Sequence, residues 1–112
     1  MSRVRLHRRL ALEAEALTAD GAGGFVRAWV ARGYVWGEVT PRTGPSVAGE
    51  EVHLSRQAYR ITVRGAAPGE PSRPVAGERF RDGSRTFAIL AVTESDPSGR
   101  YLVCAAREEE PA

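Results

Sequence analysis

Hydrophobic and polar residues alternate in short segments of this chain, which is the pattern of half-buried β-strands. The clearest case is residues 57–64, in which Tyr59, Ile61 and Val63 alternate with small or polar side chains. We therefore expect a strand here, with one face in the core and the other in water.

Residues 3–17 fit two structures. Leu, Ala and Glu are strong helix formers, and a helix would place Leu10, Ala14 and Leu17 on one stripe. Leu10, Leu12 and Ala14 also alternate with polar or small residues, which has the period of a strand. We favour the strand because a glycine-rich turn and a second strand-like segment follow at once, as in a β-hairpin.

Residues 20–39 begin with that glycine-rich turn and contain both tryptophans. They predict a long strand that bends near residues 31–33. Because aromatic side chains bury the most apolar area, we expect the core to form on this segment. The expected core residues are Phe25, Trp29, Trp36, Ile61, Phe87, Ile89 and Leu102.

The C-terminal half continues with short strands. Residues 78–81 lead into an Asp-Gly turn, and residues 84–92 are apolar enough for burial on both faces. Residues 100–106 predict a last strand, followed by a charged tail, 107–112, that we expect to be frayed.

Two long segments, 40–55 and 65–77, are rich in proline and glycine and predict loops, with at most a short helical turn near 50–56. The 112 residues suffice for a single domain, 1–112, with one modest core. A small sheet hides its edges most economically by closing on itself. We expect an all-β fold, a small antiparallel β-barrel of five or six strands with long loops.

Composition excludes several classes of protein. The longest apolar run is far shorter than the roughly 20 residues of a membrane-spanning helix, and no signal peptide is recognisable, so cytoplasmic synthesis is expected. All 16 basic residues are arginine, and the formal net charge is +2. Residues 1–64 carry ten arginines and six acids (+4), and residues 65–112 carry six and eight (−2). This asymmetry is a weak indication that the two ends meet unlike surfaces.

Candidate catalytic groups are few. His7 and His53 are far apart in sequence, and Cys104 lies in an apolar strand, where cysteine is usually a small buried hydrophobe. No convergent set of acid, base, nucleophile or metal ligands is recognisable. We therefore expect neither an enzyme nor a bound cofactor or metal.

Arginine offers one functional alternative. Arg60 and Arg64 project from the water-facing side of their strand, and four more arginines lie within residues 3–9. With Tyr and Trp nearby, such residues could form the basic, aromatic groove of a nucleic-acid-binding barrel.

The order of features along the chain resembles the head–tail joining proteins (stoppers or head-closure proteins) of tailed bacteriophages and gene transfer agents. The matching segments are RLALEA (9–14), DGAGGF (20–25), Trp29, VWGEVTPR (35–42), YRITVR (59–64), FRDGSRTFAIL (80–90) and RYLVC (100–104). They cover nearly the whole chain; each is common, and only their combination and spacing are fairly specific. The proline-rich segment 65–77 departs from the family pattern, in which we expect a shorter link.

The resemblance implies a structural protein of a phage-like particle. It implies a homo-oligomeric ring, six-fold or twelve-fold, between the portal or adaptor ring of the capsid and the tail terminator or tail tube. Double-stranded DNA would pass through this ring, and no membrane is involved. Such a ring continues the DNA channel, helps to retain packaged DNA and presents the docking surface for the tail.

The resemblance also suggests particular residues. The loop 40–55 would face the channel or a neighbouring ring. Its expected channel or partner residues are Pro41, Arg42, Gly44, Pro45 and Arg56. Leu10 and Leu12 in the first strand, or the 100–106 strand, would offer an edge to a neighbour. A tail terminator and a nucleic-acid-binding barrel stay open as alternatives.

Overall fold

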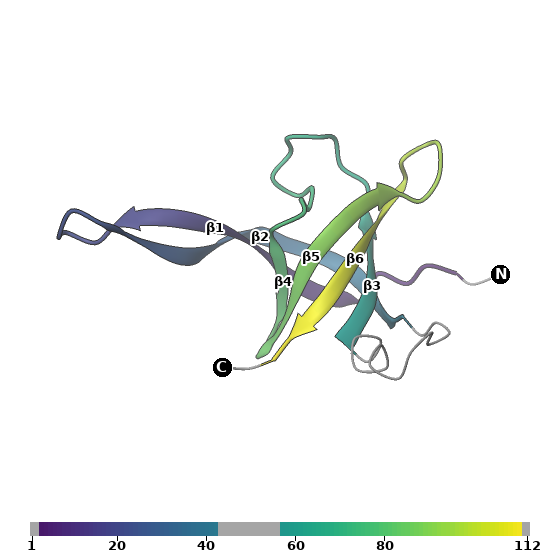
Figure 1. Ribbon diagram of the computed structural model, residues 1–112. Helices are drawn as coiled ribbons and strands as arrows, with labels where there is room; N and C mark the ends of the chain where they lie inside the picture. Colours follow the sequence, from purple (N-terminus) through teal and green to yellow (C-terminus); the bar gives the residue numbers. More distant parts are fainter. Residues whose placement is uncertain (1–2, 43–56, 111–112) are drawn as a thin grey trace.

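The computed structural model of the protein describes residues 3–42 and 57–110, and the regular elements within them are strands. They are β1 (Arg8–Ala19), β2 (Phe25–Pro41), β3 (Ala58–Arg64), β4 (Arg79–Asp82), β5 (Arg85–Glu94) and β6 (Tyr101–Glu109). All neighbouring strands pair antiparallel, and they close a barrel in the order β1-β2-β3-β6-β5-β4 (Figure 1). The prediction of a small all-β barrel is confirmed.

Alternate residues of the strands fill the barrel, because successive side chains point to opposite faces of a sheet. The buried core cluster consists of Leu10, Leu12, Ile61, Val63, Phe80, Phe87, Ile89, Leu102, Cys104 and Ala106. Four of the seven expected core residues, Ile61, Phe87, Ile89 and Leu102, belong to this cluster. The core is thus built mainly from aliphatic residues and two phenylalanines.

The other three expected core residues lie elsewhere, and this part of the sequence prediction is wrong. Phe25 is 70% exposed and Trp36 is 55% exposed, while Trp29 is half-buried at the surface. Leu10 points into the core, so its neighbour Arg9 points outward. Trp36 lies opposite Arg9 on the paired strand and therefore also points outward.

β1 and β2 are longer than the barrel and continue beyond it as a two-stranded hairpin (Figure 1). β4 pairs with β1 only at Ala11–Glu13, and β3 pairs with β2 only at Gly37–Pro41. Residues 14–31 therefore form a projecting hairpin, called the arm below. It accounts for the elongated shape of the molecule, whose principal extents are 54 × 38 × 23 Å.

The glycine-rich turn at the tip of the arm is organised by Asp20. Its Oδ1 accepts hydrogen bonds from the backbone N–H groups of Ala22, at 2.8 Å, and Gly24, at 3.0 Å. The backbone N–H of Asp20 also donates to the carbonyl of Gly24. Gly21 and Gly23 have positive φ angles of 81° and 86°, which explains the two glycines of the turn.

The expected bend in the second strand is a β-bulge. Leu12 pairs with Gly33 and Glu13 with Ala31, so Arg32 is an extra residue on β2. The extra residue reverses the alternation of β2. Trp29 and Trp36, although seven residues apart, consequently lie on the same outer face.

Two further details differ from the sequence predictions. β5 is not buried on both faces: Phe87 and Ile89 are buried but Leu90 is 56% exposed, next to a bulge between Ile89 and Ala91. β6 continues to Glu109, so residues 107–109 pair with β5 and β3 and are part of the barrel, not of a frayed tail.

Candidate interaction surfaces

The arm is held at its base by a buried carboxylate. Glu13, on the outer face of β1, is only 5% exposed and accepts hydrogen bonds from Arg79 Nε at 2.7 Å and Arg81 Nε at 3.0 Å. Arg79 also lies over the indole ring of Trp29 and reaches Glu109 at 4.0 Å. One network of charges thus connects the arm to β4 and β6.

A second set of contacts holds the other side of the base. The bulge residue Arg32 pairs with Glu78 and donates from Nη2 to the carbonyl of Glu70 at 3.3 Å. Glu78 in turn accepts the backbone N–H of Val75 at 3.1 Å. The proline-rich segment 65–77, which departs from the expected family pattern, is thereby tied to the arm.

The arm itself carries an exposed apolar surface. Leu17, Phe25, Val26 and Val30 are each half or more exposed. Exposed apolar groups that gather on a projecting element are typical of a contact with another molecule.

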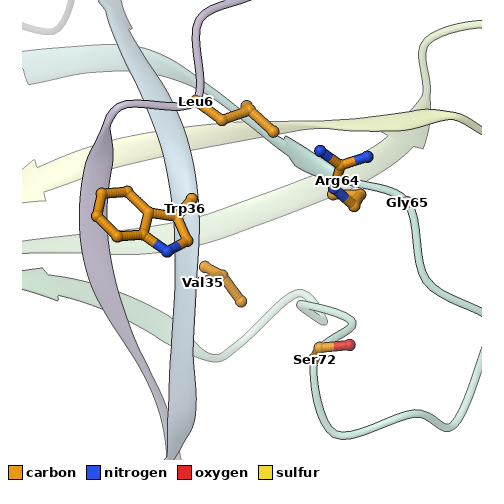
Figure 2. Close-up of a pocket in the computed structure, with 6 residues that line it drawn as sticks. All are labelled: Leu6, Val35, Trp36, Arg64, Gly65 and Ser72. Atoms are coloured by element: carbon orange, nitrogen blue, oxygen red, sulfur yellow. The ribbon is translucent and has the colours of Figure 1, made fainter.

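A surface cavity of about 570 Å³ lies on the barrel, away from the tip of the arm. It is lined by Leu6, Val35, Trp36, Arg64, Gly65 and Ser72 (Figure 2). Leu6 precedes β1, Trp36 and Val35 are on β2, and Arg64 ends β3. The exposed face of the Trp36 indole is therefore part of an apolar depression with one cationic group beside it.

Two arginines border a second, shallower depression of about 360 Å³ on the outside of β3, β5 and β6. Arg42 and Arg60 lie beside the small side chains of Ala91, Thr93, Val103 and Ala105. Neither arginine forms an ion pair with another residue of the described part of the chain. The result is a flat, cationic surface suited to a phosphate backbone or an acidic protein.

The residues expected in the loop 40–55 are only partly placed. Pro41 ends β2 and Arg42 follows it; both are exposed, and Arg42 N–H donates to the carbonyl of Ala58 at 2.8 Å. Gly44, Pro45 and Arg56 lie outside the described residues.

Leu10 and Leu12 do not form the expected surface. Both are about 1% exposed or less and belong to the core, because β1 turns them inward. The 100–106 strand, β6, is paired on both sides, with β3 and β5, so it offers no edge either. The free edge of β1 is its outer half, Ala14–Ala19, which pairs only with β2.

The candidate catalytic groups lie apart. Cys104 is fully buried, and burial raises the pKa of its thiol to about 12. His7 is exposed, with Nδ1 3.1 Å from the carbonyl oxygen of Arg5, and His53 is outside the described residues. Among the described residues, His, Cys, Asp and Glu nowhere gather in threes to hold a metal ion, and there is no helix of the length and hydrophobicity needed to span a membrane.

One partly exposed ion pair shifts the pKa values of both its members. Arg85 on β5 binds Glu108 on β6 through two hydrogen bonds, from Nε at 2.8 Å and from Nη2 at 3.0 Å. The hydrogen bonds from Arg85 lower the pKa of Glu108, and those to Glu108 raise the pKa of Arg85. Glu108 lies opposite the buried Phe87, and Arg85 is two residues from Phe87 on the same face, so the pair links β5 and β6 at the end of the barrel interior.

Sequence reasoning missed the arm and the cavity. The signal for the arm was present: the alternating pattern of β1 continues to Ala19, while its inward residues shrink from Leu10 and Leu12 to alanine. A strand that stays alternating but loses its large inward residues is leaving the core. The cavity has no comparable signal, because Leu6, Trp36 and Ser72 meet only in the folded chain.

The comparisons with known proteins agree with this architecture. A family model described as "Phage head completion protein" matches residues 1–109. A chain in the structure of the virion of a native gene transfer agent (GTA) particle is 47% identical, with a TM-score of 0.75, over 98% of this chain and 100% of that chain.

A more distant structure shares only the fold. Protein SF1141 from Shigella flexneri 2a is 20% identical, with a TM-score of 0.69, and the match covers 100% of both chains. The search among curated proteins finds none that matches.

Proposed function

The chain belongs to the phage head completion protein family, and we propose that it is a structural connector of a phage-like particle. In this proposal it forms a ring between the portal or adaptor ring and the tail, continues the DNA channel, helps to retain packaged DNA and provides the surface to which the tail binds. Its place is the head–tail interface of the particle.

The observation that carries the proposal is the 47% identity to a chain of a native GTA virion over essentially the whole length of both chains. The fold supports it independently. The barrel is small and its interior is filled by side chains, while two depressions and a projecting arm give it several surfaces for partners. A protein that must contact several others needs such surfaces.

We assign the DNA-facing or partner-facing role to the cationic depression around Arg42 and Arg60. Arg42 itself belongs to the loop 40–55, so this surface and that loop are continuous along the chain. Arginine pairs with phosphate and carboxylate groups through two parallel hydrogen bonds. We also propose that Arg56, together with Arg42, contacts DNA or a partner protein.

The proposal is tested by removing the gene from a producing strain and imaging the purified particles by electron microscopy, together with a measurement of their DNA content. The expected result is heads that are poor in DNA and lack tails, beside separate intact tails. Restoring the gene should restore joined particles. Normal tailed particles in the deletion strain would contradict the proposal.

A second function, nucleic-acid binding by the free chain, is favoured only by Arg42 and Arg60, which form no ion pair within residues 3–42 and 57–110. It predicts that the isolated chain binds DNA or RNA with a steep dependence on salt concentration. The connector proposal predicts weak binding until a ring forms. A filter-binding titration of the isolated chain at two salt concentrations separates the two.

A further inference from the structure

The arm is a two-stranded hairpin without a third strand or a second layer. β1 from Ala14 to Ala19 and β2 from Phe25 to Ala31 pair only with each other. A hairpin of this kind is marginally stable in water unless something packs on it. The arm therefore requires a partner surface to be ordered along its whole length.

One face of the arm carries no charge. Residues that lie opposite each other on paired strands share a face. This face is formed by the pairs Ala14–Val30, Ala16–Ala28 and Thr18–Val26. It continues the inward stripe of Leu10 and Leu12, so the pattern that fills the barrel core runs outward along the arm with nothing of this chain to cover it.

The other face ends in two large apolar residues. Leu17 is 67% exposed and Phe25 is 70% exposed, and both lie on the face of Glu15 and Trp29, close to the turn. Arg27 lies opposite Leu17 on the same face, and its Nη1 is 3.9 Å from Glu15 Oε2, which offsets its charge. Asp20 stands at the turn itself, fully exposed. The backbone N–H groups of Ala22 and Gly24 lower its pKa, so it carries a negative charge at neutral pH.

The cavity on the barrel complements this tip. Leu6, Val35 and Trp36 give it apolar walls, and its volume of about 570 Å³ is large enough for two apolar side chains. Arg64 lies at its side and forms no ion pair with any described residue. The same chain thus carries an apolar arm tip with the exposed anion Asp20 and, on the barrel, an apolar cavity with the cation Arg64 beside it.

The tip cannot enter the cavity of its own chain. Phe25 and Trp36 are eleven residues apart on β2, a separation of roughly 36 Å along an extended strand. The networks of Glu13 with Arg79 and of Arg32 with Glu78 hold the base of the arm and prevent it from folding back. Figure 1 shows the arm pointing away from the barrel.

We propose that the tip of the arm, Leu17 and Phe25, inserts into the Trp36 cavity of a second copy of this chain, with Asp20 beside the Arg64 of that copy. The two surfaces are different parts of the chain, so each copy can give its tip to one neighbour and receive the tip of another. Such a head-to-tail contact generates a ring when its rotation closes. The inference rests on the proposed connector function and assigns the contact between its subunits.

The test uses two cysteines in the full chain, Ala19→Cys at the tip and Ser72→Cys at the rim of the cavity. Both residues are exposed, and neither substitution changes Leu17 or Phe25. The native Cys104 is buried and does not compete. Purified particles of the double variant are oxidised and analysed by non-reducing electrophoresis and immunoblotting.

The expected result is a ladder of cross-linked oligomers, which disappears on reduction. Adding Phe25→Ser should lower the cross-linked fraction by about tenfold, because it removes an aromatic anchor. The matched control, Ala19→Cys with Ser98→Cys in the turn between β5 and β6, should stay monomeric. If the double variant yields no particles, the purified chain is oxidised at high concentration and the same readout applies.

Two results would overturn the inference. One is a chain that is present in the particles but stays monomeric after oxidation. The other is a cross-linked dimer from Ala19→Cys alone, which would mean that arms pair with arms. Absence of the chain from purified particles on a reducing immunoblot would instead refute the connector function, so the two failures are distinguishable.

Discussion

The guanidinium of Arg79 on β4 lies over the indole ring of Trp29 on β2, with Cζ 4.2 Å from the ring centroid. The same guanidinium binds the buried carboxylate of Glu13. A cation between an aromatic face and a carboxylate is fixed in position by both. The barrel thus sets the direction in which the arm projects.

Replacing Glu13 with Gln should destabilise the protein. Arg79 and Arg81 would lose their charged partner in a site that is largely removed from water, and loss of one member of a buried pair is strongly destabilising. Arg79 would retain its contacts with Trp29 and Glu109. We therefore expect the free energy of unfolding to fall by about 2 kcal/mol, which is less than the loss typical of breaking a buried ion pair. Denaturant unfolding monitored by tryptophan fluorescence measures it.

The matched control is Glu15→Gln, two residues further along the same strand face. Glu15 is exposed and its distance to Arg27 is 3.9 Å, so the change should stay within about 0.5 kcal/mol. Equal losses for the two variants would show that the Glu13 network does not stabilise the base of the arm.

The Arg85–Glu108 pair should make a pH-dependent contribution to stability. Because the pKa of Glu108 is lower in the folded chain than its ordinary value of 4.5, the pair stabilises the fold above that value, and the contribution is lost as the pH falls through the lowered pKa. Near neutral pH the protein should be about 1 kcal/mol more stable than the variant Glu108→Gln, since the pair is partly exposed.

Unfolding of the protein and of Glu108→Gln is therefore compared over a range of pH. The two free energies should converge at acidic pH, below the lowered pKa of Glu108, where its carboxyl group is neutral. A stability difference that stays constant down to that pH would contradict the assigned ion pair.

Cys104 should be unreactive in the folded protein. Its thiol is buried and its pKa is raised to about 12, so almost no thiolate is present at mildly alkaline pH. A chromogenic thiol reagent should react with one thiol per chain in denaturant and with almost none in its absence. Rapid reaction of the folded chain would mean that the strand β6 is not packed as described.

Reversing the charge of the cationic depression should affect the particle and not the fold. Arg42→Glu with Arg60→Glu should leave the circular dichroism spectrum and thermal midpoint nearly unchanged, because surface positions away from ion pairs contribute little. Infectivity or DNA retention should fall, since the surface would then repel phosphate. Arg100→Glu, in an exposed turn, is the control; normal particles from the double variant would refute the assignment.

The strands could be predicted from the sequence where the alternation of apolar and polar residues alone determines them. Ile61 and Val63 on β3 show the period of a strand, and the bend expected near residues 31–33 coincides with the bulge at Arg32. The connector family could also be recognised from the order of the segments. These features depend on local pattern, which a sequence displays directly.

The rest depends on tertiary contacts. Trp29 and Trp36 were assigned to the core because of their size, but the bulge and the register with Arg9 place both on the outside. Leu10 and Leu12 were assigned to a strand edge that would pair with a neighbour in the ring, but both point into the core. Which face of a strand points into the core depends on the strands that pair with it. β4, which closes the barrel next to β1, is far from β1 in the sequence.

Electron cryomicroscopy of purified particles, focused on the junction between head and tail, tests the central claim most directly. The account predicts a ring of copies of this barrel between the portal or adaptor ring and the tail, each with the tip of its arm in the Trp36 cavity of the next. Density at that junction into which the barrel does not fit, in particles that contain the chain elsewhere, would contradict the account.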